Sequence, residues 1–404
     1  MTTQRPSSEP EKITSVGSLR ELIDIVTGRA FKDQVEREDA GLAEVLPFPF
    51  LGLVGQEEMK LALITAVINP LVNGVLLVGP RGTGKTTIVR SLIDLLPSIQ
   101  RSACHYGCLP EDIETSGIDA VCPDCARKYG MGMPLTKTDQ GRLVELPLHA
   151  RLEDLVAMWD ERAMAEDRLV LKSGILKQAD LNTLYIDEVN LLGDELINAI
   201  LDASAQGTYT IRRGPLSNTY RARFTLIGSM NPEEGSLRPQ IMDRFGLRVI
   251  VQGLKTPDER LEAYHRSRAY RLNPRATVAQ YADPTSQARA EIEAARALLP
   301  QVIIPPAVEQ VGTTLIQRLG IDSLRAEMTL FEAARAYAAA DGRKETSLGD
   351  LRVVAPLALR LRQSPFMIQY FKDQNDAESQ LSSILDAIIP PQEKNSYGEE
   401  NEQP

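Results

Sequence analysis

Short apolar runs alternate with helix-like segments in the first part of the chain. The clearest runs predict strands at residues 74–78, 183–186, 224–227 and 248–251. Two of them are continuously aliphatic and β-branched, as in strands that are covered on both faces. Such alternation is typical of a parallel sheet with helices around it. Two more short strands on either side of a Gly-Pro turn predict a hairpin within residues 208–223.

After Pro257 the pattern changes to helices. Apolar residues recur there at three- and four-residue spacing, as at Leu330, Ala334 and Tyr337. The helices are predicted at residues 258–271, 287–299, 306–319, 324–341 and 348–363. The predicted fold class is therefore α/β, in which a core with a parallel sheet precedes an all-α domain. The expected bounds are 46–252 for the core, 253–295 for a helical linker and 296–366 for the all-α domain.

Three other segments carry structural expectations. Residues 1–45 are polar and predicted to be a mostly helical leader, and the acidic tail, 367–404, is predicted to be disordered. The single tryptophan, Trp159, lies in a predicted helical run and is expected to pack in the core.

Composition narrows the class of protein. With 404 residues and 43% hydrophobic content, the chain can bury a sizeable core. No apolar run reaches the roughly 18–20 residues that span a bilayer, and the first residues lack the apolar stretch of a secretory signal. Four cysteines do not make a disulfide scaffold in so long a chain, so we expect a cytoplasmic protein. A net charge of −10 argues against bulk electrostatic binding of nucleic acid.

A phosphate-binding loop follows the first predicted strand. The sequence GPRGTGKT has the full P-loop pattern between a strand and a helix predicted at 87–96. Its glycines let backbone N–H groups face the phosphates, and the helix N-terminus adds positive potential. Lys85 would neutralise phosphate charge and Thr86 would bind Mg²⁺. The expected nucleotide contacts are Gly79, Pro80, Arg81, Gly82, Thr83, Gly84, Lys85, Thr86 and Thr87.

Polar residues at the ends of later strands complete a hydrolytic site. Asp187 and Glu188 follow the strand at 183–186, where Asp187 suits the Mg²⁺ shell and Glu188 could activate the attacking water. Asn231 follows the next strand and could hold that water against the γ-phosphate. Arg244 comes after a turn, where it is too far along to reach its own nucleotide easily, and it suits an arginine finger given to a neighbouring subunit.

The chain resembles an AAA+ ATPase and, more closely, the ATPase I subunit family of magnesium chelatase. The resemblance covers about residues 45–365. It rests on residues 47–70, 75–87, 184–192, 228–246 and 320–339. Its most specific part is GSMNPEEGSLRPQIMDRFG at 228–246, which AAA+ proteins in general lack.

The resemblance implies roles and partners. Asn231 corresponds to sensor 1, Arg244 to the trans-acting arginine finger and Arg325 to sensor 2 on the helical lid. Members of the family form homo-oligomeric rings, typically hexamers, that hydrolyse ATP and act with a von Willebrand A-type subunit. A separate large subunit of the chelatase binds the porphyrin. This chain would therefore be the ATPase motor of a ligase complex.

The four cysteines form a cluster of their own in the sequence, within an insert predicted at residues 101–130. Cys104 and Cys108 are followed by Cys122 and Cys125, which gives two short-loop pairs of soft ligands that suit tetrahedral Zn²⁺. Redox-active thiols and unliganded cysteines remain the alternatives.

Two other functions stay open. The same AAA+ branch includes replicative helicases, and Arg212 and Arg213 on the predicted hairpin could touch a nucleic-acid backbone. A non-hydrolysing scaffold is disfavoured because the hydrolytic residues are all present.

Overall fold

A parallel sheet forms the centre of the protein. The computed structural model describes residues 46–104, 107–159, 171–213 and 216–363, so the predicted leader, 1–45, and tail, 367–404, lie outside the described residues. Within them the strand order is β11-β1-β10-β7-β4, with every neighbouring pair parallel. The sheet strands are β1 (Val75–Val78), β4 (Leu143–Leu146), β7 (Thr183–Ile186), β10 (Thr225–Met230) and β11 (Leu247–Ile250).

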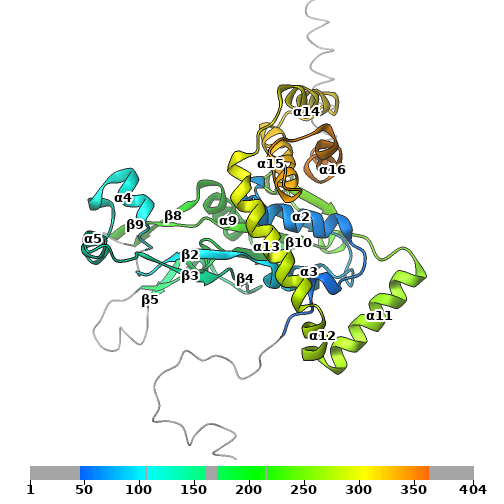
Figure 1. The fold of residues 1–404 in the computed structure, drawn as a ribbon, viewed down its shortest axis with the longest axis horizontal. Helices are drawn as coiled ribbons and strands as arrows, with labels where there is room; N and C mark the ends of the chain where they lie inside the picture. Colours follow the sequence, from blue (N-terminus) through cyan, green and yellow to red (C-terminus); the bar gives the residue numbers. More distant parts are fainter. Residues whose placement is uncertain (1–45, 105–106, 160–170, 214–215, 364–404) are drawn as a thin grey trace, which may run out of the picture. The chain divides into compact units, whose positions relative to one another are not determined.

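Alternate residues of each strand face two different cores, which explains why the strands read as continuous apolar runs. Val75 and Leu77 of β1 belong to the larger core, and Leu76 between them belongs to the smaller one. The larger core includes helices on one face of the sheet: α2 (Glu57–Ile68), α3 (Lys85–Ser91) and α13 (Ala282–Leu298) (Figure 1). The smaller core includes helices on the other face: α6 (Leu152–Val156), α8 (Ile175–Ala179), α9 (Asp194–Gln206) and α10 (Pro239–Met242).

Three C-terminal helices join the larger core. They are α14 (Pro306–Arg318), α15 (Leu324–Ala340) and α16 (Leu348–Leu359), and they lie together in Figure 1. Between the sheet and these helices the chain forms α11 (Pro257–Leu272) and α12 (Pro274–Gln280) before α13. In the described part of the chain, no helix is both long and apolar enough to cross a membrane.

Three antiparallel strand pairs extend from the core. They are β2 (Ser98–Ser102) with β3 (Thr136–Gln140), β5 (Ala157–Trp159) with β6 (Leu171–Ser173), and β8 (Thr208–Arg213) with β9 (Leu216–Arg221). The pair β8–β9 confirms the predicted hairpin. Helices α4 (Pro110–Ser116) and α5 (Pro123–Gly130) lie between β2 and β3 and sit close to β9 (Figure 1).

The α/β fold class is confirmed, with local corrections. Strand β4 and helix α12 were not predicted, and the helix after the P-loop ends at Ser91 before a 3₁₀ turn at Leu92–Leu95. The helical interpretation at Trp159 is wrong, because this residue ends β5, which gains its hydrogen bonds by pairing with β6. The division at residues 252 and 296 remains a prediction.

Candidate functional site

The P-loop connects β1 to α3 at the carboxyl edge of the sheet. Gly82 and Gly84 have φ angles of 76° and 88°, in the left-handed region that glycine tolerates without strain. Gly84 directly precedes α3, so the loop ends on a helix N-terminus. The Lys85 ammonium donates to the carbonyl oxygens of Gly79 and Pro80, at 2.6 and 2.8 Å. Burial lowers the pKa of Lys85.

Asp187 links the P-loop to the end of β7. The Thr86 hydroxyl donates to Asp187 Oδ2 at 3.1 Å, across 101 positions of sequence. The other carboxylate oxygen, Oδ1, accepts hydrogen bonds from the hydroxyls of Tyr185, at 2.9 Å, and Ser229. A hydroxyl beside an oriented carboxylate is the hard-oxygen donor set that Mg²⁺ prefers, so these residues fit the ion. The structure contains the predicted contact between Thr86 and Asp187.

Glu188 adopts a strained backbone conformation beside Asp187. Its φ is 53°, which is uncommon for a residue with a side chain, and its N–H donates to Ser229 Oγ at 3.2 Å. Its carboxylate lies 3.7 Å from the Arg81 guanidinium of the P-loop. The bend turns Glu188 out of the strand and towards the phosphate-binding loop.

Asn231 lies at the same edge, just after β10, and is buried. Its Nδ2 donates to Glu234 Oε1 at 3.0 Å, and its Oδ1 accepts from the N–H of Glu233 at 3.2 Å. Glu234 also forms an ion pair with Arg81. The hydrogen bond from Asn231, followed by those from Arg81, lowers the pKa of the Glu234 carboxyl. A chain of contacts thus connects Asn231 to the P-loop.

The two remaining arginines lie apart from this cluster. Arg244 forms an ion pair with Asp202 on α9, and Arg325 on α15 donates to Asp243 Oδ2 at 3.0 Å. Neither arginine has an ion pair or hydrogen bond with the P-loop among the described residues.

A cavity of about 620 Å³ lies between the start of α2 and the end of β11. It is lined by residues 55–59, just before and within α2, and by residues after β11, including Gln252 and Gly253. A Cβ placed on Gly79 would be 2.3 Å from the carbonyl oxygen of Val251, so the end of β11 touches the start of the P-loop. A larger cavity, about 890 Å³, lies by Thr183 and Thr225 at the opposite ends of their strands, away from the carboxyl edge of the sheet.

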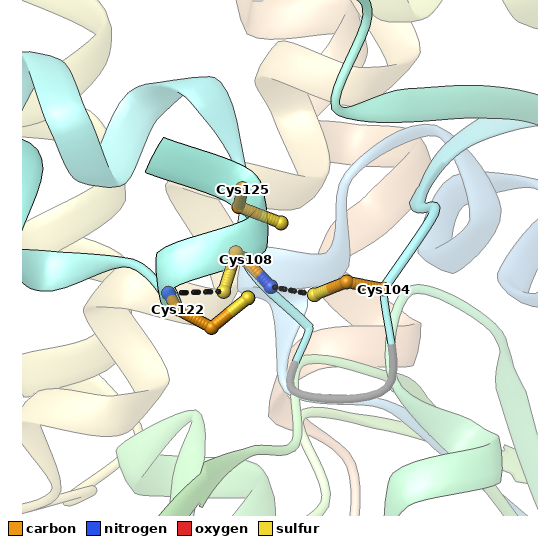
Figure 2. Close-up of side chains that lie close together, drawn as sticks. All are labelled: Cys104, Cys108, Cys122 and Cys125. Atoms are coloured by element: carbon orange, nitrogen blue, oxygen red, sulfur yellow. Dashed lines mark hydrogen bonds between the residues drawn. The ribbon is translucent and has the colours of Figure 1, made fainter. Parts of the chain in front are cut away.

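The four cysteines meet at one point outside the nucleotide site. Every sulfur lies within 4.8 Å of the others, and all four cysteines are free thiols. Figure 2 shows the four sulfur atoms turned towards a common centre. Burial opposes ionisation of Cys104, but hydrogen bonds from Ser102 and from the Cys108 N–H outweigh it and lower the pKa of that thiol to about 6.

Sequence reasoning missed three supporting residues, Tyr185, Ser229 and Glu234. The signal for two of them was present, because residues two apart in a strand share a face. Tyr185 stands two positions before Asp187, and Ser229 two before Asn231. The role of Glu234 depends on the fold of the 3₁₀ turn at Pro232–Glu234, which spacing alone does not reveal.

Known proteins resemble this chain over most of its length. The magnesium-chelatase 38 kDa subunit of Acidiphilium rubrum is 41% identical, over 79% of this chain and 92% of that protein. The magnesium-chelatase subunit ChlI homolog of Methanocaldococcus jannaschii is 39% identical, over 82% and 93%. A solved structure of the complex between subunits BchI and BchD of magnesium chelatase matches 79% of this chain and 96% of that chain, at 35% identity and a TM-score of 0.43.

Two family models match parts of the chain. One is described as the MCM P-loop domain and matches residues 149–252, and the other is described as the AAA lid domain and matches residues 313–384. The first covers Asp187, Glu188, Asn231 and Arg244, and the second includes Arg325. Both magnesium-chelatase relatives are at least 39% identical over more than three quarters of this chain, and the P-loop geometry is that of an ATPase. The chain belongs to the magnesium-chelatase I-subunit family of AAA+ ATPases.

Proposed function

We propose that this chain is the motor subunit of a ring assembly and converts ATP hydrolysis into remodelling of a partner protein. The observation that carries the proposal is the 3.1 Å hydrogen bond between Thr86 of the P-loop and Asp187 of β7. This hydrogen bond joins the P-loop, which binds phosphate, to the carboxylate that is proposed to bind the metal. Glu188 and Asn231 lie at the same sheet edge, where open α/β sheets bind their ligands.

Each residue has one task in this mechanism. Lys85 leaves the carbonyls of Gly79 and Pro80 and binds the phosphates. Thr86 and Asp187 would hold Mg²⁺, and the ion would offset the negative charge of the phosphates. The Glu188 carboxylate accepts a proton from the attacking water, and the Asn231 amide orients that water.

The nucleoside occupies the 620 Å³ cavity between α2 and the end of β11. This volume falls within the usual range for small-molecule sites. Its lining includes Ile250 and Gln252, the neighbours of Val251, whose carbonyl oxygen touches Gly79 at the start of the P-loop. Met59 and Val249 offer it an apolar wall, and the backbone around Gln252 offers hydrogen-bonding groups.

Membership of the family supports the proposal of a ring and of a partner subunit. The relatives are named as subunits of magnesium chelatase, which supports a larger assembly and supports metal insertion as the work that hydrolysis drives. We propose a homo-oligomeric ring, a hexamer as is typical of the family, with Arg244 and Arg325 acting as finger and sensor 2. Its partner is a von Willebrand A-type subunit, and a separate subunit binds the porphyrin. The cytoplasmic location also stays a prediction.

A helicase-like function is the second candidate, and the match of residues 149–252 to the MCM P-loop domain favours it. Hydrolysis that DNA stimulates, with a steep loss as salt rises, would support this candidate over the chelatase-type motor. The net charge of −10 argues in the other direction.

Two variants test the motor mechanism. Lys85→Ala should lose both nucleotide binding and Mg²⁺-dependent hydrolysis, because the phosphates lose their cation. Glu188→Gln should bind ATP like the unchanged chain but lose turnover, because only the water-activating group is removed. Binding is measured with a fluorescent ATP analogue and turnover by phosphate release. Loss of ATP binding in Glu188→Gln would contradict the role of Glu188, and unchanged ATP binding in Lys85→Ala would contradict the role of Lys85. The protein that co-purifies with Glu188→Gln in ATP would identify the partner.

A further inference from the structure

The insert between β2 and β3 has very little core of its own. Its buried apolar cluster consists of Cys108, Val121, Cys125 and Leu135, with Cys104, Ile113, Cys122 and Ala126 packed against them. Half of this cluster is therefore cysteine. No described residue between positions 103 and 135 belongs to either of the two large cores. A module this small usually needs a disulfide or a metal to hold its shape.

The cysteines are arranged for a metal and not for two separate disulfides. Their sulfurs lie within 4.8 Å of one another, all four around one centre (Figure 2). A tetrahedral Zn²⁺ with Zn–S bonds of about 2.3 Å would bring the sulfurs to about 3.8 Å apart, a contraction of about 1 Å at most. The described thiols are all unbridged, and they are the only cysteines in the sequence.

The backbone around the cysteines also favours thiolates. The N–H of Cys108 donates to the sulfur of Cys104, and the N–H of Cys122 donates to the sulfur of Cys108, both at 3.3 Å. Such hydrogen bonds orient sulfur ligands and offset their negative charge. Cys122 and Cys125 stand at the start of α5, where the helix N-terminus favours negative charge as well.

We propose that Cys104, Cys108, Cys122 and Cys125 bind one structural Zn²⁺ as four thiolates, and that the resulting zinc module braces the β8–β9 hairpin. Four thiolates close the coordination sphere, so the ion has no open position for catalysis. Its role is to stabilise the fold of the insert. The free energy of metal binding adds to the free energy of folding, because the site forms only in the folded module.

The brace is made by Arg221 of β9. Its guanidinium forms an ion pair with Asp112 of α4 and donates to the carbonyl oxygen of Gly107, at 3.4 Å. Gly107 stands between Cys104 and Cys108, so this contact reaches the metal-binding loop itself. Asp112 is held in place because it also accepts from the N–H of Leu109, at 2.8 Å. These contacts hold β9, the strand of the hairpin that precedes β10 in the chain. Asn231 follows directly after β10.

Metal analysis of the full chain, purified without chelator, tests the zinc site. We expect about one Zn²⁺ per chain, and its loss in Cys122→Ser and in Cys125→Ser. Asp124→Asn is the matched control: it changes an exposed carboxylate between two of the cysteines and should keep the zinc. Lys85→Ala should also keep it, which separates a failure of this proposal from a failure of the ATPase mechanism.

Co²⁺ substitution keeps the test decisive even where a cysteine variant fails to fold. Cobalt in the unchanged chain should show the charge-transfer and ligand-field absorption of a tetrahedral tetrathiolate site, which can arise only from these four residues. A chain that lacks zinc as purified and binds Co²⁺ without thiolate bands would overturn the proposal. Disulfides between the cysteines of the purified chain, found by mass spectrometry before reduction, would overturn it in favour of redox-active thiols.

Hydrogen exchange tests the brace. Arg221→Ala should keep one zinc per chain but increase amide exchange in β8 and β9, whereas removal of zinc by a chelator should increase exchange in both the insert and the hairpin. Exchange in α15, far from the hairpin in sequence, serves as the internal control and should not change. Unchanged hairpin exchange in both experiments would refute the brace.

Discussion

Arg325 and Asp243 form an ion pair that joins α15 to the residue directly before Arg244. The Arg325 guanidinium lies 3.0 Å from Asp243 Oδ2. Two further arginines, Arg248 and Arg362, lie 3.5 and 2.9 Å from the same carboxylate, and their side chains are only 1% exposed. Burial, together with the charge of Arg362, lowers the pKa of Arg248 to about 10. The Asp243 carboxylate thus forms ion pairs with three arginines, one on α15, one on β11 and one after α16.

Removal of the Asp243 charge should therefore destabilise the fold. We expect Asp243→Asn to lower the free energy of unfolding by about 3 kcal/mol, the lower end for removing one partner of a buried ion pair. The loss of stability is expected at the lower end because both arginines keep hydrogen bonds to backbone carbonyls. Arg248 keeps its bond to Met242, and Arg362 keeps its bond to Gly246. Urea denaturation, followed by circular dichroism, measures the change.

Asp202→Asn provides the control for this variant. Asp202 also pairs with an arginine, Arg244, but its side chain is 54% exposed, and exposed pairs contribute little. A change of less than about 1 kcal/mol is expected. If both variants lose stability equally, the convergence of arginines on Asp243 is not what makes that carboxylate important.

Glu234 should affect turnover through Asn231. Glu234→Ala removes the acceptor that fixes the Asn231 amide, so the attacking water would be held less accurately. Misplacement of about 1 Å can reduce a rate by about 10²-fold. We expect kcat to fall by up to this factor with little change in nucleotide affinity, as measured by phosphate release and by titration with a fluorescent ATP analogue.

Glu233→Ala is the matched control, because Glu233 is adjacent and exposed and contacts Asn231 only through its backbone N–H. It should keep nearly full kcat. If Glu234→Ala weakened ATP binding and left kcat intact, the residue would act through Arg81 and the P-loop and not through Asn231.

Much of the nucleotide site could be predicted because its residues follow local rules. The P-loop is one continuous motif, and Asp187, Glu188 and Asn231 each stand just after an apolar strand. In a parallel sheet those strand ends share one edge, so their meeting follows from the fold class. The structure confirms the contact between Thr86 and Asp187.

What could not be predicted depends on pairing over long distances. Strand β4 is short, and it is recognisable only by its parallel pairing with β7, about 40 residues later. The contacts of Asp243 with Arg325 and Arg362 span 82 and 119 positions. No periodicity in the sequence encodes such contacts, because they arise when the C-terminal helices pack on the core.

In the single chain, Arg244 forms an ion pair with Asp202, and the side chain of Arg244 is 30% exposed. An exposed ion pair contributes little free energy, so Arg244 could leave Asp202 and bind the nucleotide of a neighbouring subunit in a ring with little loss of stability. Rings made only of Arg244→Ala subunits should be inactive because every pocket lacks its finger. Rings made only of Lys85→Ala subunits should be inactive because every pocket fails to bind phosphate.

Mixing these two variants separates the trans role from a cis role. In a mixed ring, some intact Arg244→Ala pockets meet the sound finger of a Lys85→Ala neighbour. A finger contributes about 10³–10⁵ in rate, so even a minority of repaired interfaces should restore measurable phosphate release. A finger that acted on its own nucleotide would give no rescue, because neither subunit would then hold a complete site. Subunit exchange is verified by energy transfer between labelled chains, and mixed rings that exchange but stay at background would refute the trans role of Arg244.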